Sequence, residues 1–109
     1  MTADSKRLYS LIGLCQKAGR LVSGGDMVEE AICTGRAKLV IIALDAGETM
    51  AKRFRDKAAY YEVPVLSFGT KEELGRSIGK ELRSAVAMTD AGFSGSFIKK
   101  YQQHPGVKD

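Results

Sequence analysis

The segment Ser23-Gly24-Gly25-Asp26 combines residue types that favour anion binding at the start of a helix. Two glycines let another backbone approach closely, and the free N–H groups of a first helical turn attract phosphate. Four cationic residues lie just before this segment or just after the helix that it opens: Lys17, Arg20, Arg36 and Lys38. This arrangement fits a phosphate-binding site, and the same glycines also fit an ordinary turn before a helix.

The charge balance suits a polyanionic partner and also fits a solubilising surface. The 109 residues include 17 Lys and Arg against 13 Asp and Glu, which gives a formal net charge of +4. No apolar run approaches the roughly 18–20 residues of a membrane-spanning helix, and the N-terminus lacks the apolar stretch of a secretion signal. We therefore expect a cytoplasmic protein with one domain over residues 1–103 and a frayed tail at residues 104–109.

Patterns typical of enzymes and metal sites are missing from the sequence. His104 is the sole histidine and lies in the tail, where a general base is hard to position. The string Gly75–Lys80 resembles a phosphate-binding loop, but three residues separate its glycines where the motif needs four, and Glu81 follows the lysine. Cys15 and Cys33 form no metal-ligand pair, and their apolar surroundings predict buried, reduced thiols. We expect no enzyme, no metal, no cofactor and no small-molecule substrate.

Helices and strands that could position these residues alternate along the chain. Apolar residues at helical spacing predict helices over residues 8–15, 26–32, 50–61, 70–78 and 93–101. Short apolar runs predict strands at residues 21–22, 39–44, 63–66 and 85–88, of which 39–44 has the unbroken pattern of a strand buried on both faces. This alternation predicts an α/β fold, a three-layer α/β/α sandwich around a mixed sheet of about four strands.

Local signals predict several details of these elements. Two pairs have the spacing of a helix-capping box, Ser23 with Asp26 and Thr70 with Glu73. The helical spacing of Phe54 and Tyr61 places both on the buried face of the third helix. Asp45 follows the buried strand without a catalytic partner, and we expect it to cap the turn that follows.

A longer pattern resembles a known protein family. It runs through residues 24–32, 35–43 and Asp45, and continues in Val63-Pro64-Val65, Lys71-Glu72-Glu73-Leu74-Gly75 and Ala85-Val86-Ala87. In this order the segments resemble the kink-turn-binding ribosomal proteins of the L7Ae/L30e type. The segments at residues 17–24 and 90–93 look most like the bacterial YlxQ-type branch of that family. The resemblance extends from about Lys6 to Phe93.

The resemblance implies an α/β/α domain that binds bent internal-loop RNA, ribosomal RNA for example. In such relatives the helix-start segment docks in the kinked major groove at sheared G·A pairs, and a later loop covers an extruded base. By position, Gly24 and Gly25 permit close approach, while Asp26 and Met27 stand where Asn and Glu are usual. The base-covering loop corresponds to residues 80–84, with Lys80, Leu82, Arg83 and Ser84 as its expected contacts. Structured RNA or the ribosome is thus the expected partner of a monomeric protein.

Two positions depart from the family pattern. Met27 cannot accept a hydrogen bond from a guanine edge as a glutamate would, and Glu30 stands where a lysine commonly meets phosphate. These departures weaken the expected contacts with a kink-turn, whereas general binding to structured RNA depends on several cations. The alternative function is a protein-interaction adaptor on the same fold, in which the RNA surface is partly lost and Met27 and Leu82 contact a partner.

Overall fold

The computed structural model describes residues 3–103, and helices and strands alternate strictly over this range. The helices are α1 (Ala3–Lys17), α2 (Gly25–Cys33), α3 (Glu48–Tyr60), α4 (Lys71–Ser77) and α5 (Ala91–Gln103). The strands are β1 (Leu21–Ser23), β2 (Leu39–Ile42), β3 (Val65–Ser67) and β4 (Ala85–Met88). The predicted alternation is confirmed, whereas the tail at residues 104–109, with His104, lies outside the described residues.

The four strands form one mixed sheet in the order β1-β4-β2-β3. β2 and β3 run parallel, with Val40 opposite Val65, and β4 runs antiparallel to both of its neighbours. β3 is an edge strand, and Pro64 directly precedes it, where the missing N–H breaks no pairing inside the sheet. The last strand in the sequence therefore lies between the first and the second.

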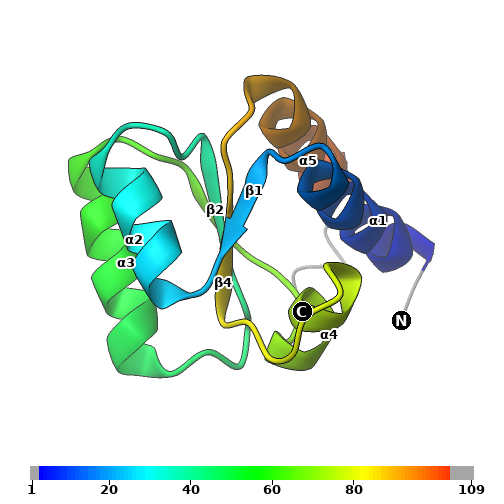
Figure 1. Ribbon diagram of the computed structural model, residues 1–109, viewed down its shortest axis with the longest axis horizontal. Coiled ribbons are helices and arrows are strands. Elements are labelled where there is room, and N and C mark those ends of the chain that lie inside the picture. The colour runs from blue at the N-terminus through cyan, green and yellow to red at the C-terminus, as the bar shows by residue number, and fades with distance from the viewer. Residues whose placement is uncertain (1–2, 104–109) are drawn as a thin grey trace.

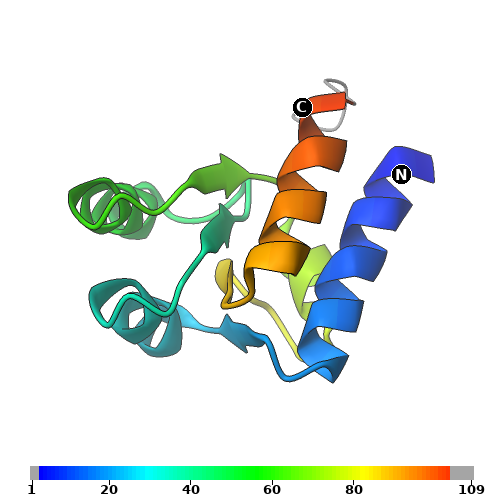
Figure 2. The ribbon, with the colours of Figure 1, turned by 90° about the horizontal axis from the view of Figure 1, so that it is seen from above.

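Helices cover both faces of this sheet, as Figures 1 and 2 show: α2 and α3 on one face, and α1, α4 and α5 on the other. The side chains of β2 alternate between the two layers, so that Leu39 and Ile41 pack below α1, α4 and α5, while Val40 and Ile42 pack below α2 and α3. All four are fully buried, as an unbroken apolar run predicts for a strand covered on both faces. The three-layer α/β/α sandwich is confirmed.

Several local predictions differ from the structure, among them the strand expected at residues 63–66, which begins at Val65 and ends at Ser67. β2 ends at Ile42, and Leu44, which the sequence places in the strand, is 46% exposed because the chain has already turned away from the sheet. Tyr61 is 44% exposed, since the helix ends at Tyr60 and the left-handed Glu62 (φ 57°) redirects the chain before another buried turn forms. Cys33 is only half-buried, because it closes α2 beside Lys57, whereas Cys15 is buried as predicted.

Candidate nucleic-acid interface

A backbone hydrogen bond fixes the start of α2, and no side chain covers its first turn. Gly24 has a φ of 90°, which favours glycine, and its N–H donates to the Ala85 carbonyl of β4 at 3.2 Å. No side chain caps the helix, so the predicted Ser23 cap is wrong. Ser23 is the last residue of β1, and Gly25, Asp26 and Met27 of the first turn are exposed. The positive end of the helix dipole thus faces solvent.

The loop between α4 and β4 lies against this helix start. Arg83 Nε donates to Ser23 Oγ at 3.2 Å, and the Arg83 backbone N–H donates to the Lys71 carbonyl at 3.0 Å. The Ser84 carbonyl accepts from the N–H of Ala43 at 2.8 Å. The structure therefore brings together two distant segments of the predicted site, residues 24–27 and residues 80–84. We call this region the Gly24 end.

Gly75 sets the path of the α4–β4 loop, a role that was not predicted from the sequence. A Cβ atom at this position would lie 1.5 Å from the Glu81 carbonyl oxygen, and the Lys80 N–H donates to the Gly75 carbonyl at 2.8 Å. The loop backbone can lie on the helix only where no side chain intervenes. A glycine inside the predicted helix at residues 70–78 is the sequence signal that could have identified this role.

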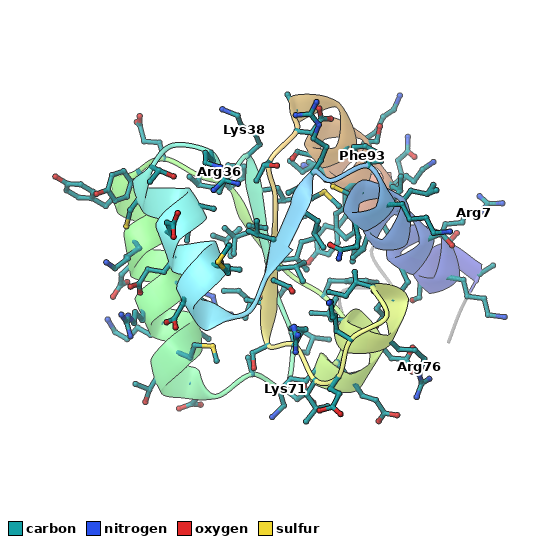
Figure 3. The ribbon with its side chains drawn as sticks, in the orientation of Figure 1. Arg7, Arg36, Lys38, Lys71, Arg76 and Phe93 are labelled. Carbon is teal, nitrogen blue, oxygen red and sulfur yellow. The ribbon has the colours of Figure 1, made fainter. Side chains whose placement is uncertain are left out.

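The surface of the Gly24 end is partly apolar. Met27 is 48% exposed and Leu82 is 60% exposed, unusual values for large apolar side chains. The carboxylates of Asp26 and Glu30 are on exposed residues of α2, whereas Glu29 forms an ion pair with Arg53 of α3, with Nε 2.7 Å from Oε2. Figure 3 places Lys71 at the same end of the sheet. The region can therefore offer backbone N–H groups, a carboxylate acceptor and two apolar side chains to a ligand.

The other predicted cations lie at the opposite end of the sheet. α2 has nine residues and is therefore about 13 Å long, and Arg36 and Lys38 follow its C-terminus. Figure 3 shows both side chains at the far end of the sheet from Lys71. Arg20 precedes β1, whose other end leads to Gly24, and Lys17 closes α1. These four cations were predicted to lie beside the Gly24 segment, and the structure separates them from it.

Neither a metal cluster nor a membrane span is found in the described part of the chain. Between residues 3 and 103 no three His, Cys, Asp or Glu side chains are grouped to hold a metal ion. The helices over the same range are too short or too polar to cross a membrane.

Burial raises the pKa of the Cys15 thiol to about 11, with a smaller contribution from the nearby Asp90 carboxylate.

The fold is that of an α/β/α protein, and the uncapped start of α2 exposes backbone N–H groups that can bind a phosphate or an acceptor atom of a nucleobase. Residues 6–98 match the ribosomal protein L7Ae/L30e/S12e/Gadd45 family, and the chain belongs to that family. It is 46% identical over 90 residues to the RNA-binding protein YlxQ of Bacillus subtilis (strain 168), covering 83% of this chain and 90% of the relative. It is 36% identical over 91 residues to the RNA-binding protein YlxQ of Enterococcus faecium, covering 84% of this chain and 87% of the relative.

More distant relatives and solved structures agree with this assignment. The large ribosomal subunit protein eL30 of Candida albicans is 32% identical over 93 residues, covering 84% of this chain and 88% of the relative. A Bacillus halodurans C protein of unknown function has a TM-score of 0.84 and 37% identity, covering 87% of this chain and 96% of its own. The Giardia lamblia 15.5kD RNA binding protein shares the fold, with a TM-score of 0.75 at 17% identity over 98% of this chain and 92% of its own. The resemblance seen in the sequence is confirmed for the family and for its YlxQ branch.

Proposed function

We propose that the chain is a non-enzymatic RNA-binding protein that holds structured RNA at its Gly24 end. The observation that carries the proposal is the Arg83–Ser23 hydrogen bond, which joins the α2 start to the α4–β4 loop. These are the segments that the family resemblance assigns to a kinked groove and to an extruded base. The similarity to the RNA-binding protein YlxQ and to the large ribosomal subunit protein eL30 supports an RNA ligand.

The chemistry of the Gly24 end explains how RNA would be held. Gly24 and Gly25 present no side chain, so a phosphate or a base edge can approach the free N–H groups of the first turn. Asp26 supplies a carboxylate that can accept from a guanine amino group. Leu82 supplies an exposed apolar face for an unstacked base, and Lys80 and Arg83 supply positive charge beside it.

The proposed ligand is a bent internal loop within a larger structured RNA, such as ribosomal RNA. The domain over residues 1–103 would bind it as a monomer in the cytoplasm, in association with the ribosome. No cofactor takes part, because hydrogen bonds, charge and stacking account for recognition of this kind. Met27 lacks the acceptor that a glutamate would offer, so we propose modest affinity for a kink-turn itself.

A protein-interaction adaptor is the second candidate function. The exposed Met27 and Leu82 favour it, because apolar side chains at the rim of a site can equally contact another protein. The Glu30 carboxylate favours it too: it is exposed on α2 at a position where the family pattern has a lysine, and its negative charge repels phosphate. The two functions differ in one measurable property, which is the dependence of RNA binding on salt.

A mobility-shift titration against salt tests the proposed function. A kink-turn, a plain hairpin and a plain duplex are compared for the wild type, for Arg83→Ala and for the control Arg7→Ala on α1, which Figure 3 places far from the Gly24 end. We expect the wild type to bind the kink-turn more tightly than the duplex, and Arg83→Ala to weaken kink-turn binding about ten-fold. Absence of RNA binding at low salt, or equal loss in both variants, would favour the adaptor.

A further inference from the structure

A second cationic surface lies at the end of the sheet opposite the Gly24 end. Two of its backbone segments are bound to the end of β4: the Lys38 N–H donates to the Met88 carbonyl at 2.7 Å, and the Arg20 carbonyl accepts from the Thr89 N–H at 2.8 Å. β1 and β2 flank β4, so Arg20 and Lys38 stand on either side of it, about 10 Å apart. Arg36 lies in the same loop as Lys38.

The charges of this surface are available to a ligand. Arg20, Arg36 and Lys38 are all exposed. The Lys38 ammonium donates to the Gly35 carbonyl at 3.4 Å, a neutral partner that leaves its positive charge uncompensated. The loop that holds Arg36 and Lys38 carries no acidic residue. Figure 3 shows the Arg36 and Lys38 side chains at the same edge of the molecule.

The carboxylates at this end of the sheet belong to Asp90, Glu62 and Glu30. Asp90 Oδ2 accepts from the Phe93 N–H at 2.9 Å, which commits that carboxylate to the start of α5. Glu62 is exposed after the end of α3, and Glu30 lies one turn before the end of α2. The cations nevertheless face solvent on both sides of β4, where a chain of phosphates could reach them.

An exposed aromatic ring lies at the same end of the molecule. Lys57 Nζ is 3.9 Å from Cys33 Sγ, which places the last turn of α3 against the last turn of α2. Tyr60 is one helical turn beyond Lys57 and 80% exposed, and its ring packs edge-on against Tyr61 at a centroid distance of 5.0 Å. Exposed aromatic rings beside cations are the combination that stacks unpaired bases and holds their phosphates.

We propose that this surface, which we call the Arg36 end and define by Arg20, Arg36, Lys38 and Tyr60, is a second RNA-binding site. Arg20, Arg36 and Lys38 contact backbone phosphates of a duplex segment, and Tyr60 stacks on an unpaired base beside it. The whole sheet separates the Arg36 end from the Gly24 end, so one domain can hold two RNA segments at once. The inference shares an RNA ligand with the proposed function and does not require the Gly24 end to bind.

The first experiment measures binding of a plain RNA duplex with a single-stranded overhang by fluorescence anisotropy across a salt series. Arg36→Ala/Lys38→Ala is compared with the control Lys6→Ala/Arg7→Ala, which removes the same amount of charge from exposed residues of α1. The first variant should bind about ten-fold more weakly, and its slope of log affinity against log salt should be flatter by about 1.5. Equal slopes for the two variants would overturn the proposal.

Tyr60 has its own test with the same probe. Tyr60→Ala should weaken binding of the overhang duplex about five-fold, while Tyr60→Phe, which keeps a stacking face, should bind as the wild type does. Equal affinities of the Ala and Phe variants would remove Tyr60 from the site. Far-UV circular dichroism of each variant checks that the fold is retained.

A two-RNA experiment separates this inference from the proposed function. The wild type is saturated with a short kink-turn RNA, and the labelled duplex is then added in a native gel. We expect a ternary complex, and Arg36→Ala/Lys38→Ala should require about ten-fold more duplex to form it without changing kink-turn affinity by more than about two-fold. Displacement of the kink-turn by the duplex would overturn the second site. Duplex binding through Arg36 and Lys38 without any kink-turn binding would instead contradict the proposed function alone.

Discussion

The Asp45 carboxylate accepts a hydrogen bond from the backbone N–H of Lys71, with Oδ1 2.8 Å from N, across 26 residues of sequence. Asp45 follows β2, and Lys71 is the first residue of α4. A second acceptor at the same helix start is Thr70 Oγ1, which bonds to the Glu73 N–H at 3.1 Å. The bond to Asp45 therefore fixes the start of α4, and the loop that leaves this helix, relative to the sheet.

We expect Asp45→Ala to lower the free energy of unfolding by about 1 kcal/mol, because a helix N–H loses its acceptor. Asp45→Asn keeps an acceptor oxygen at this position and should lose less than half of that amount. Urea unfolding followed by circular dichroism measures both. If the two variants were equally unstable, the charge of Asp45 rather than the hydrogen bond would be responsible.

Replacing Gly75 should displace the α4–β4 loop. A Cβ atom would lie 1.5 Å from the Glu81 carbonyl oxygen, so Gly75→Ala should cost about 1–3 kcal/mol of stability and weaken RNA binding at the Gly24 end. Gly95→Ala on α5 is the matched control, because nothing lies within 4 Å of its Cβ and the change should stabilise the helix by about 0.5–1 kcal/mol. Similar unfolding midpoints for the two variants would show that the loop adapts without cost.

The two departures from the family pattern can be reversed. Met27→Glu introduces an acceptor for a guanine amino group, worth about 1–3 kcal/mol of discrimination, and Glu30→Lys turns a repulsion from phosphate into an attraction. The double variant should bind a kink-turn at least about ten-fold more tightly than the wild type, with Met27→Glu alone improving selectivity over a plain duplex. Gel-shift titrations at fixed salt measure both. A correctly folded double variant without any gain would favour the adaptor function.

Stability should fall at alkaline pH because of Cys15. This thiol is buried and donates to the Arg20 carbonyl with Sγ 3.1 Å from O, and burial raises its pKa from 9.0 to about 11. The folded chain thus holds the proton more tightly than the unfolded chain, so the free energy of unfolding should decrease as the pH rises from about 9 to about 11. Below pH 9.0 the thiol has no such effect.

The contribution of Cys15 can be isolated by substitution. Burial also raises the pKa values of Tyr9 and Tyr101, whose ordinary value is 10.0, so the wild type loses stability from more than one group. Cys15→Ala should show a shallower alkaline loss than the wild type. Urea unfolding at pH values on both sides of 9.0 measures the difference. The same pH dependence in the wild type and Cys15→Ala would exclude the thiol as its source.

The fold was predictable because its signals are local. The unbroken apolar run that forms β2 and the Thr70 cap of α4 both act over a few residues: β2 lies within the predicted strand, and Thr70 caps α4 as predicted. The helix-start glycines were equally visible, since Gly24 adopts a backbone conformation that disfavours other residues. The predicted Ser23 cap failed because the partner of its hydroxyl is Arg83, 60 residues later, which no local spacing reveals.

The candidate site was predicted only in part for the same reason. Arg36 and Lys38 are near Gly24 in the sequence, but the rigid α2 helix carries them to the other end of the sheet. Asp45 was expected to cap its own turn and bonds instead to a helix far along the chain. Two residues at opposite ends of a helix are separated by the length of that helix, however close they are in the sequence. Which segments far apart in the sequence come together depends on the order of the strands in the sheet.

The position of β4 between β1 and β2 also has a consequence for the order in which the protein assembles. β2 and β3 are close in sequence and can pair early, but β1 has no neighbour until β4 is available. Nearly the whole chain must therefore leave the ribosome before the sheet can close, and until then β1 and one side of β2 present unpaired edges. We expect a nascent chain stalled before residue 85 to remain sensitive to proteases.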